Sequence, residues 1–246
     1  TKLYIVLDGP KTEEEKVFTE ATKDIFDEID WNCEVKKLYS VGNLGLKKRF
    51  KSALDEIFKN EESLIILEDD TLPTGSFFRY CDLLLEKFKN NNEIIQINGH
   101  NYLSKTDTDD SYYMTTFSEI WGWATWSDRW FENYNDNFRE NWNKIKKTDN
   151  FKNKFLSHDE YEYFYNIFDN AHKNIIDSWE FPWLFSMRMN ELLAVSPNKN
   201  LVKNLGFGHP GATHTHQKLK YLSITRNKNY ELNFPLQHPK KINKVN

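Results

Sequence analysis

The sequence predicts one α/β domain built on a mostly parallel sheet with helices on its faces. Through residues 1–99, short apolar runs alternate with segments that have the period of amphipathic helices. Residues 64–67 are apolar without polar alternation, which is typical of a strand covered on both faces. The alternation therefore predicts βαβ units with right-handed crossovers. The length of 246 residues is compatible with a single large domain.

The elements of residues 1–99 are predicted in order. The run KLYIVL (residues 2–7) is a strand, and Thr12 with Glu15 forms a capping box for a helix that continues to about residue 30. Residues 33–39 form the next strand, and an apolar stripe from Phe50 to Phe58 predicts the following helix. After the strand at residues 64–67, a helix begins near Ser76, and a last strand covers residues 93–97.

The pattern changes after residue 99 to polar loops that carry many aromatic side chains, so the regular scaffold is expected to end there. Helices are predicted at residues 154–172 and 180–192, and short extended pieces at residues 194–197 and 200–202. A polar tail from residue 227, rich in Lys, Asn and Pro, is expected to wrap the surface or fray.

The composition argues against several classes of protein. The formal net charge is -4 and the 28% of charged residues carry both signs, so nucleic acid is not an expected partner. Cys33 and Cys81 lack the spacing of a zinc site or a disulfide framework and are predicted to be reduced core thiols. The chain has neither a signal-peptide pattern nor an apolar run of membrane-spanning length, which favours a cytoplasmic location.

Three acids, Glu68, Asp69 and Asp70, follow the apolar run at residues 64–67. Ligands of open α/β sheets bind outside the carboxyl ends of the strands, and carboxylates crowded there repel one another unless a cation or hydrogen-bond donors compensate them. Alternatively, Asp69 or Asp70 only caps the helix that begins near Ser76. The residues alone favour metal binding and capping about equally.

A series of short blocks, taken in order, resembles bacterial glycosyltransferases of the nucleotide-diphospho-sugar transferase superfamily, in particular N-acetylglucosaminyltransferases. The resemblance spans residues 2–215, and its specificity comes from the number and order of the blocks. The blocks are Asp8-Gly9-Pro10, Asn43-Leu44-Gly45, Ile66-Leu67-Glu68-Asp69-Asp70 with Pro73 and Phe77-Phe78, Ile120-Trp121-Gly122-Trp123-Ala124-Thr125-Trp126, Ser178-Trp179-Glu180-Phe181-Pro182-Trp183, Asn204-Leu205-Gly206-Phe207-Gly208 and Ala212-Thr213-His214-Thr215.

This resemblance implies the GT-A fold and a metal-dependent glycosyltransferase of the hexosyl type. The implied reaction moves a sugar from a nucleotide-diphosphate donor, with a UDP-sugar favoured, to a glycan acceptor, with inversion at the anomeric carbon. The implied cofactor is Mn²⁺ or Mg²⁺. The domain would cover residues 1–226, with a nucleotide-sugar half (1–99), an acceptor half (100–226) and a tail (227–246). Peripheral association with a membrane is compatible with this interpretation.

The resemblance assigns the acids to the donor. Glu68-x-Asp70 stands where the family has its D-x-D-like motif, so Asp70 is the implied metal ligand, and hard cations prefer such oxygen ligands. Glu68 and Asp69 would accept hydrogen bonds from hydroxyls of the ribose and the donor sugar. His214 would complete the metal shell or donate to the diphosphate, although a structural role is equally favoured.

Four further residues are candidates for binding the nucleotide. Asp8 follows the first strand, where the family places an acid against the base or ribose, and a simple turn aspartate is the alternative. Asn43 lies in the next matching loop. Lys47 and Arg49 follow it at a helix start and could reach a phosphate, although most of this charge is expected to be solvated.

The later blocks suggest sugar contacts and a catalytic base. Trp121 and Trp123 are predicted to stack on sugar rings, with packing of a small subdomain as the alternative. Glu180 is the candidate general base, in a position where relatives usually have aspartate. Asp177 is the alternative base, and a dipole-stabilising acid in a helical first turn is the non-catalytic explanation for Glu180.

The chain differs from the family at its start, because relatives have another strand and helix before the strand at residues 2–7. Either the sequence is truncated there, or another segment or subunit fills the gap, or nucleotide binding is impaired. Absence of an interior strand would leave backbone groups of residues 2–7 unpaired. This departure, together with glutamate in place of the usual aspartate at Glu180, suggests the first alternative function, a degenerate carbohydrate-binding module that keeps the tryptophans but not turnover. A metal-dependent phosphohydrolase is the second, although the sequence has no matching second cluster of acids and histidines.

Overall fold

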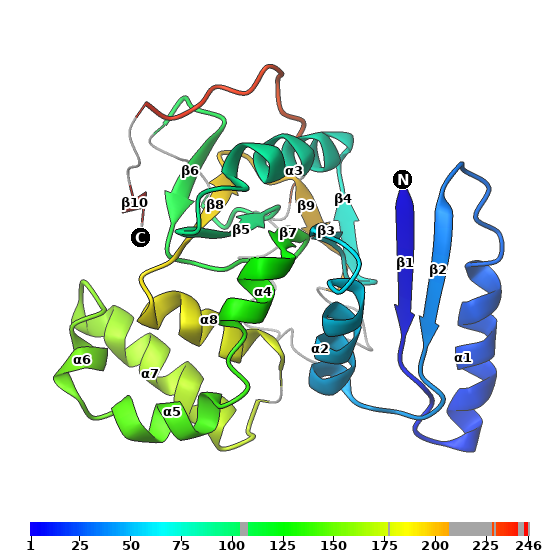
Figure 1. Cartoon of the computed structure of the whole chain (residues 1–246), viewed down its shortest axis with the longest axis horizontal. Helices are drawn as coiled ribbons and strands as arrows, with labels where there is room; N and C mark the ends of the chain where they lie inside the picture. The colour runs from blue at the N-terminus through cyan, green and yellow to red at the C-terminus, as the bar shows by residue number, and fades with distance from the viewer. Residues whose placement is uncertain (104–107, 177, 207–227, 229, 241–243, 246) are drawn as a thin grey trace.

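The computed structural model describes residues 1–103, 108–176, 178–206, 228, 230–240 and 244–245, and these form an α/β structure (Figure 1). Its largest sheet is mixed, with the strand order β10-β6-β8-β5-β7-β3. The strands are β3 (Ser63–Ile66), β5 (Ile94–Asn98), β6 (Tyr112–Thr115), β7 (Trp123–Trp126), β8 (Leu193–Pro197) and β10 (Lys244–Val245).

The prediction of a mostly parallel sheet is wrong for this central sheet. Strand β7 is antiparallel to both β3 and β5, and β6 is antiparallel to β8. Only β5 with β8 and β10 with β6 pair in parallel among the described strands of this sheet. The physical reason is that the aromatic segment WATW, which was expected to be loop, forms β7 and inserts between two strands of the first half.

A separate two-stranded sheet contains β1 (Lys2–Leu7) and β2 (Glu34–Tyr39), which pair in parallel as expected for a βαβ unit. The connecting helix α1 (Glu13–Ile25) begins as predicted, because the Thr12 side chain accepts a hydrogen bond from the Glu15 amide. Within the described residues, β2 is the only strand that pairs with β1. This unit stands at the right of Figure 1, beside the central sheet.

Side-chain contacts tie the β1–β2 unit to the remainder of the chain. Lys2 Nζ and Tyr4 Oη both donate to Glu61 Oε1 at 2.6 Å. Helix α1 has no buried residue, and its apolar side chains Val17 and Phe18 are 71% and 73% exposed. These side chains therefore face solvent and do not pack into a core.

Helix α3 (Gly75–Phe88) packs on the central sheet and supplies much of its core, including Phe77 and the free thiol of Cys81, which is buried as predicted. Cys33 is also a free thiol but is only half-buried. Helix α2 (Leu46–Ile57) supplies Leu54 to a second cluster, and a short antiparallel ribbon joins β4 (Thr71–Pro73) to β9 (Val202–Asn204).

The capping role proposed for the acids is wrong. The N-cap of α3 is Thr74, and the Ser76 amide donates instead to the Glu231 carboxylate at 2.9 Å. The acceptor comes from the C-terminal segment, 155 residues away. Leu232 and Leu236 are buried in the core, whereas most other residues of 230–240 are exposed, so this part of the tail wraps the surface, the first of the two expected alternatives.

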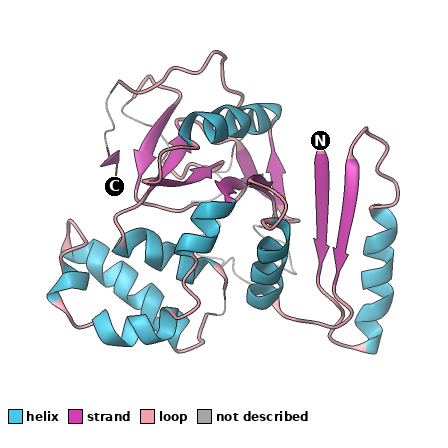
Figure 2. Ribbon diagram, in the orientation of Figure 1, coloured by secondary structure: helices cyan, strands magenta, loops and turns pink. Residues whose placement is uncertain are grey.

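The remaining helices gather at one end of the central sheet (Figure 2). They are α4 (Ser127–Asn133), α5 (Phe138–Ile145), α6 (Asp149–Lys152), α7 (His158–His172) and α8 (Glu180–Met189). Helix α7 is shorter than predicted because Ser157 caps it, with its hydroxyl accepting from the Glu160 amide. An aromatic cluster around Trp142, Phe168 and Phe185 holds α5, α7 and α8 together.

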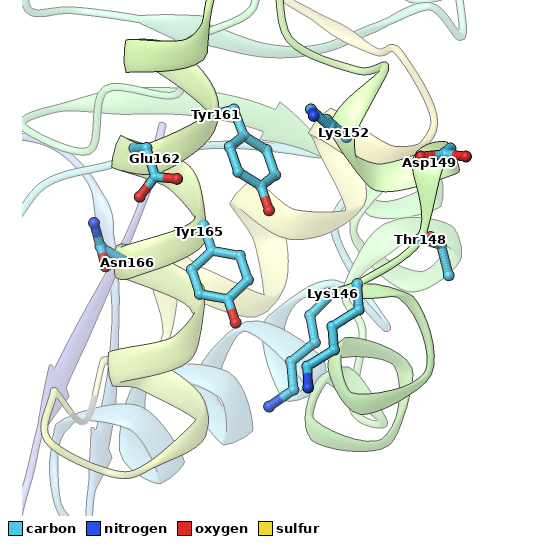
Figure 3. Close-up of a pocket in the computed structure, with 9 residues that line it drawn as sticks. Lys146, Thr148, Asp149, Lys152, Tyr161, Glu162, Tyr165 and Asn166 are labelled. Atoms are coloured by element: carbon cyan, nitrogen blue, oxygen red, sulfur yellow. The ribbon is translucent and has the colours of Figure 1, made fainter.

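A shallow hollow of about 450 Å³ lies between α7 and the segment joining α5 to α6. Figure 3 shows the Tyr161 and Tyr165 rings and the Lys146 side chain pointing into it. Lys146 Nζ also lies 3.4 Å from Asp169 Oδ1, so this cation is already compensated by a carboxylate. In the part of the chain that the structure describes, no helix combines the length and apolar character needed to cross a membrane.

Candidate functional site

The three acids that follow β3 lie in a tight turn that separates their side chains. The Glu68 amide donates to Thr71 Oγ1 at 3.0 Å, and the Thr71 hydroxyl donates to the Glu68 carbonyl at 2.6 Å. Asp69 is exposed, whereas Glu68 and Asp70 are partly buried. The turn thus lets adjacent like charges point to different surroundings.

Asp70 is directed toward β9 and has one unused oxygen. Its Oδ2 accepts a hydrogen bond from Asn204 Nδ2 at 3.2 Å, whereas its Oδ1 is buried and has no hydrogen-bond partner among the described residues. A Cβ at Gly206 would lie 2.7 Å from Asp70 Oδ2, so glycine permits this close approach. Burial, followed by the charge of Asp69, raises the pKa of Asp70. A cation bound at Oδ1 would stabilise the ionised carboxylate and so offset the effects of burial and of the Asp69 charge on the pKa of Asp70.

These surroundings fit a metal that is completed by substrate. The described residues contain no group of three or more His, Cys, Asp or Glu side chains that could hold a metal ion. Mg²⁺ is commonly bound by one or two carboxylates together with phosphate oxygens and water, and so does not need such a group. Asp70 can serve as that carboxylate. His214, the second predicted ligand, lies outside the described residues.

Glu68 and Glu180 bring two carboxyl groups from different elements into one electrostatic environment. Burial, followed by the charges of Asp70 and Glu180, raises the pKa of Glu68 to about 7, although a hydrogen bond from Trp179 opposes the shift. Burial raises the pKa of Glu180, in the first turn of α8, to about 7 as well. A carboxylate with a pKa near neutrality suits general-base catalysis. Asp177, the alternative base, lies outside the described residues.

The raised pKa of Glu180 predicts a loss of stability as the pH rises. Below about 4.5 the group is protonated in both states, and between 4.5 and about 7 the unfolded chain releases its proton more readily. The free energy of unfolding should therefore fall across this window, by up to about 3 kcal/mol from this group. Urea denaturation of wild type and Glu180→Gln at pH 5 and pH 8 measures it. If the free energy of unfolding depends on pH identically in the two proteins, ionisation of Glu180 does not destabilise the fold, and the prediction is contradicted.

Glu119 is a partly buried carboxyl group that no sequence pattern indicated. Burial, followed by the charge of Glu180, holds the pKa of Glu119 well above its usual range. Its only sequence signal is that it is a lone acid in an aromatic segment, four residues before Trp123. Its electrostatic interaction with Glu180 joins residues far apart in the chain, so no local pattern indicates it.

An aromatic wall lies on the adjoining loops. The Trp121 ring is partly exposed, and its centroid lies 4.5 Å from that of His100 and 5.2 Å from that of Tyr102. Burial lowers the pKa of His100 to about 4, so its imidazole is neutral at physiological pH. Tyr102 is 40% exposed. Trp121 and Tyr102 therefore offer accessible ring surface of the kind that stacks on sugars.

Trp123 does not fit its predicted contact with a sugar. Its side chain is 0% exposed and packs against Trp179, with ring centroids 5.3 Å apart and planes 12° apart. The Phe50 ring stacks on Trp179, with the two ring centroids 3.9 Å apart. The packing alternative is thus the correct one for Trp123, because β7 places this side chain in the interior of the sheet.

Trp123→Ala should therefore act on stability. Removal of a fully buried indole leaves a cavity, and the expected loss in the free energy of unfolding is about 3–5 kcal/mol. Trp121→Ala is the matched control and should cost less, because that ring is partly exposed. Urea denaturation measures both. Equal costs, or a folded Trp123→Ala protein with weakened saccharide binding, would argue against the core assignment.

The residues predicted to contact the nucleotide mainly stabilise the loops after β1 and β2. Asp8 accepts hydrogen bonds from Asn43 Nδ2 at 3.1 Å and from the Leu44 and Gly45 amides at 2.9 Å each. Arg49 Nε donates to the Leu7 carbonyl at 3.0 Å, and its guanidinium also bonds the Leu38 carbonyl. Asp8 therefore matches the turn alternative. Lys47 lies partly buried in the first turn of α2.

No protein-family model matches this chain, and no curated protein matches it.

Proposed function

We propose that the protein is a metal-dependent glycosyltransferase with a GT-A-like arrangement. It would transfer a sugar from a nucleoside-diphosphate donor, with a UDP-sugar favoured, to a hydroxyl of a glycan acceptor. The observation that carries this proposal is the acidic turn after β3. There a buried Asp70 oxygen has no partner among the described residues, and Glu68 is coupled electrostatically both to Asp70 and to Glu180.

The donor would be held from the turn after β3. Asp70 Oδ1 would bind Mn²⁺ or Mg²⁺, which supplies charge neutralisation for the leaving diphosphate when bound. Glu68 and Asp69 would accept hydrogen bonds from hydroxyls of the ribose and donor sugar, and the Trp121 face would stack on a sugar ring. Lys47 remains the proposed contact to a phosphate.

Glu180 would act as the general base. The acceptor oxygen forms a bond to the anomeric carbon while the bond from that carbon to the diphosphate breaks, and the proton of the acceptor hydroxyl passes to the Glu180 carboxylate. Attack opposite the leaving group inverts the anomeric configuration. The pKa of about 7 makes Glu180 an effective proton acceptor near neutral pH.

One observation favours a carbohydrate-binding module without turnover. Asp8, Asn43 and Arg49, which the resemblance assigns to the nucleotide, are engaged in hydrogen bonds within the protein. A protein that uses these residues only for structure would bind saccharides on its aromatic wall without needing a nucleotide. A two-metal phosphohydrolase has no comparable support, because the described residues contain no three-ligand metal group.

The test is calorimetry of UDP binding in the presence of Mn²⁺ and in EDTA, followed by a hydrolysis assay over a panel of nucleotide sugars. The transferase should bind UDP with Mn²⁺, lose most of that affinity in EDTA, and slowly hydrolyse one donor. A carbohydrate-binding module should bind saccharides and show neither nucleotide affinity nor hydrolysis. UDP binding that is the same in EDTA would contradict a metal-dependent site.

A further inference from the structure

The loop that carries Glu119 is fixed to the centre of the sheet by two buried amide side chains. Gln96 and Asn98, on β5, are both 0% exposed. Gln96 Nε2 donates to the Glu119 carbonyl at 2.9 Å, and the Glu119 amide donates to Asn98 Oδ1 at 3.2 Å. Both backbone groups of Glu119 are therefore held by side chains from one strand, which sets the position of its Cα.

Gln96 also contacts the helix that carries Glu180. Its Oε1 accepts from Trp183 Nε1 at 2.7 Å and from the Ser118 hydroxyl at 2.8 Å. Trp183 lies three residues after Glu180, about one helical turn along α8. One buried amide thus fixes the loop of Glu119 and the first turns of α8 relative to each other, which is the arrangement expected for two side chains that act together.

Two tyrosines from other elements share this environment. The Tyr102 ring lies 5.2 Å, centroid to centroid, from the ring of Trp121, two residues after Glu119, and Phe164, next to Tyr163, lies 5.7 Å from Phe117, two residues before Glu119. In agreement with these contacts, burial and then the charges of Glu119 and Glu180 raise the pKa of both tyrosines. Their side chains are 40% and 58% exposed, so each has ring surface accessible to a ligand. Two other charged groups lie close enough to affect this environment. The charge of Glu180 raises the pKa of Glu68, and the charge of Arg188 opposes the rise in the pKa of Tyr163. Arg188 also forms an ion pair with Glu160 at 2.9 Å.

We propose that Glu119, Glu180, Tyr102 and Tyr163 form the acceptor subsite of the transferase, and that this subsite takes an uncharged saccharide. The inference rests on the proposed function, because it presumes that Glu180 faces an acceptor. Hydroxyls of a neutral sugar can donate to an ionised Glu180 and accept from a protonated Glu119, and the ring C–H groups can pack on the tyrosines. An acidic sugar would place a second negative charge beside Glu180, and the nearby cation Arg188 is only 5% exposed and pairs with Glu160 inside the protein.

The test compares matched pairs of saccharides that differ only in charge. The neutral probes are the methyl β-glycosides of glucose and galactose, and the charged probes are the methyl β-glycosides of glucuronic and galacturonic acid with a free carboxylate. Each probe is titrated into the full chain at pH 8 without nucleotide, and binding is followed by NMR. The wild type should bind one neutral glycoside at least roughly tenfold more tightly than its uronide. Glu180→Gln should reduce that preference to less than about threefold, because the charge that repels the uronide is gone.

Variants of Glu119 test whether its side chain contributes a hydrogen bond to the saccharide or a negative charge. Glu119→Gln keeps a neutral donor and should retain affinity for the neutral glycoside within about threefold, whereas Glu119→Ala should lose roughly tenfold. Glu162→Gln is the matched control, because this acid is exposed on α7 and should change nothing. Thermal melts check that each variant is folded, and the wild-type comparison holds even if a Glu119 variant is not.

Three results would overturn the proposal: equal affinity of the wild type for glycoside and uronide, no binding of any neutral glycoside, or unchanged glycoside affinity in a folded Glu119→Ala protein. Failure of the inference is distinguishable from failure of the proposed function. Metal-dependent UDP binding with no preference for neutral saccharides rejects only the subsite. A preference for neutral saccharides without UDP binding rejects the transferase and leaves a saccharide-binding surface.

Discussion

Asp70→Ala is expected to lower the Mn²⁺-dependent affinity for UDP by roughly 100-fold or more, because it removes the proposed protein ligand of the metal. The fold should survive the change. Asp70 lies in a turn after β3, and its carboxylate is partly buried with one oxygen unpartnered among the described residues, so its removal relieves a desolvation cost. Calorimetry with UDP and Mn²⁺ measures the affinity, and circular dichroism measures the fold.

Asp69→Ala is the matched control for this experiment. Asp69 is adjacent, has the same charge and is exposed. It should weaken binding much less, because it loses only a solvated charge and a contact to a hydroxyl. Equal losses in the two variants would mean that only the summed negative charge of the turn matters. Undiminished affinity in a folded Asp70→Ala protein would remove the metal assignment.

Glu180→Gln is expected to lower turnover by roughly 100-fold or more while donor affinity is unchanged. The amide preserves the size of the side chain and its place in the first turn of α8, but it cannot accept the proton of the acceptor hydroxyl. Glu140→Gln is the matched control, because Glu140 is an acid in the first turn of α5. If both acids only stabilise a helix dipole, each amide should cost a few tenths of a kcal/mol and leave the rate unaltered.

The alternative base is tested in the same assay. Normal turnover in Glu180→Gln together with lost turnover in Asp177→Asn would transfer the role of general base to Asp177. Normal turnover in both variants would reject this segment as catalytic. Donor affinity must be measured on each variant, since a loss of both affinity and rate would indicate a disturbed site and not a missing base.

Several features followed from the sequence because their causes are local. The capping box at Thr12, the parallel pairing of β1 with β2 and the burial of Cys81 depend on residues close in sequence or on one repeating pattern. The acids after β3 and the start of α8 at Glu180 were located correctly for the same reason. Periodicity and capping act over one or two turns, so a single sequence is sufficient to show them.

Only the tertiary structure decided which of these residues act together. Trp121 and Trp123 lie two residues apart in one aromatic segment, but only Trp123 belongs to β7, whose four residues are all buried and which pairs with β3 and β5, whereas Trp121 precedes the strand and is partly exposed. Glu119 lies near Glu180 because the Gln96 side chain forms hydrogen bonds both to the Glu119 carbonyl, 23 residues away in sequence, and to Trp183 of α8, 87 residues away. Strand direction and such bonds depend on residues far apart in the chain, and no local pattern encodes which distant partner a buried polar group will find.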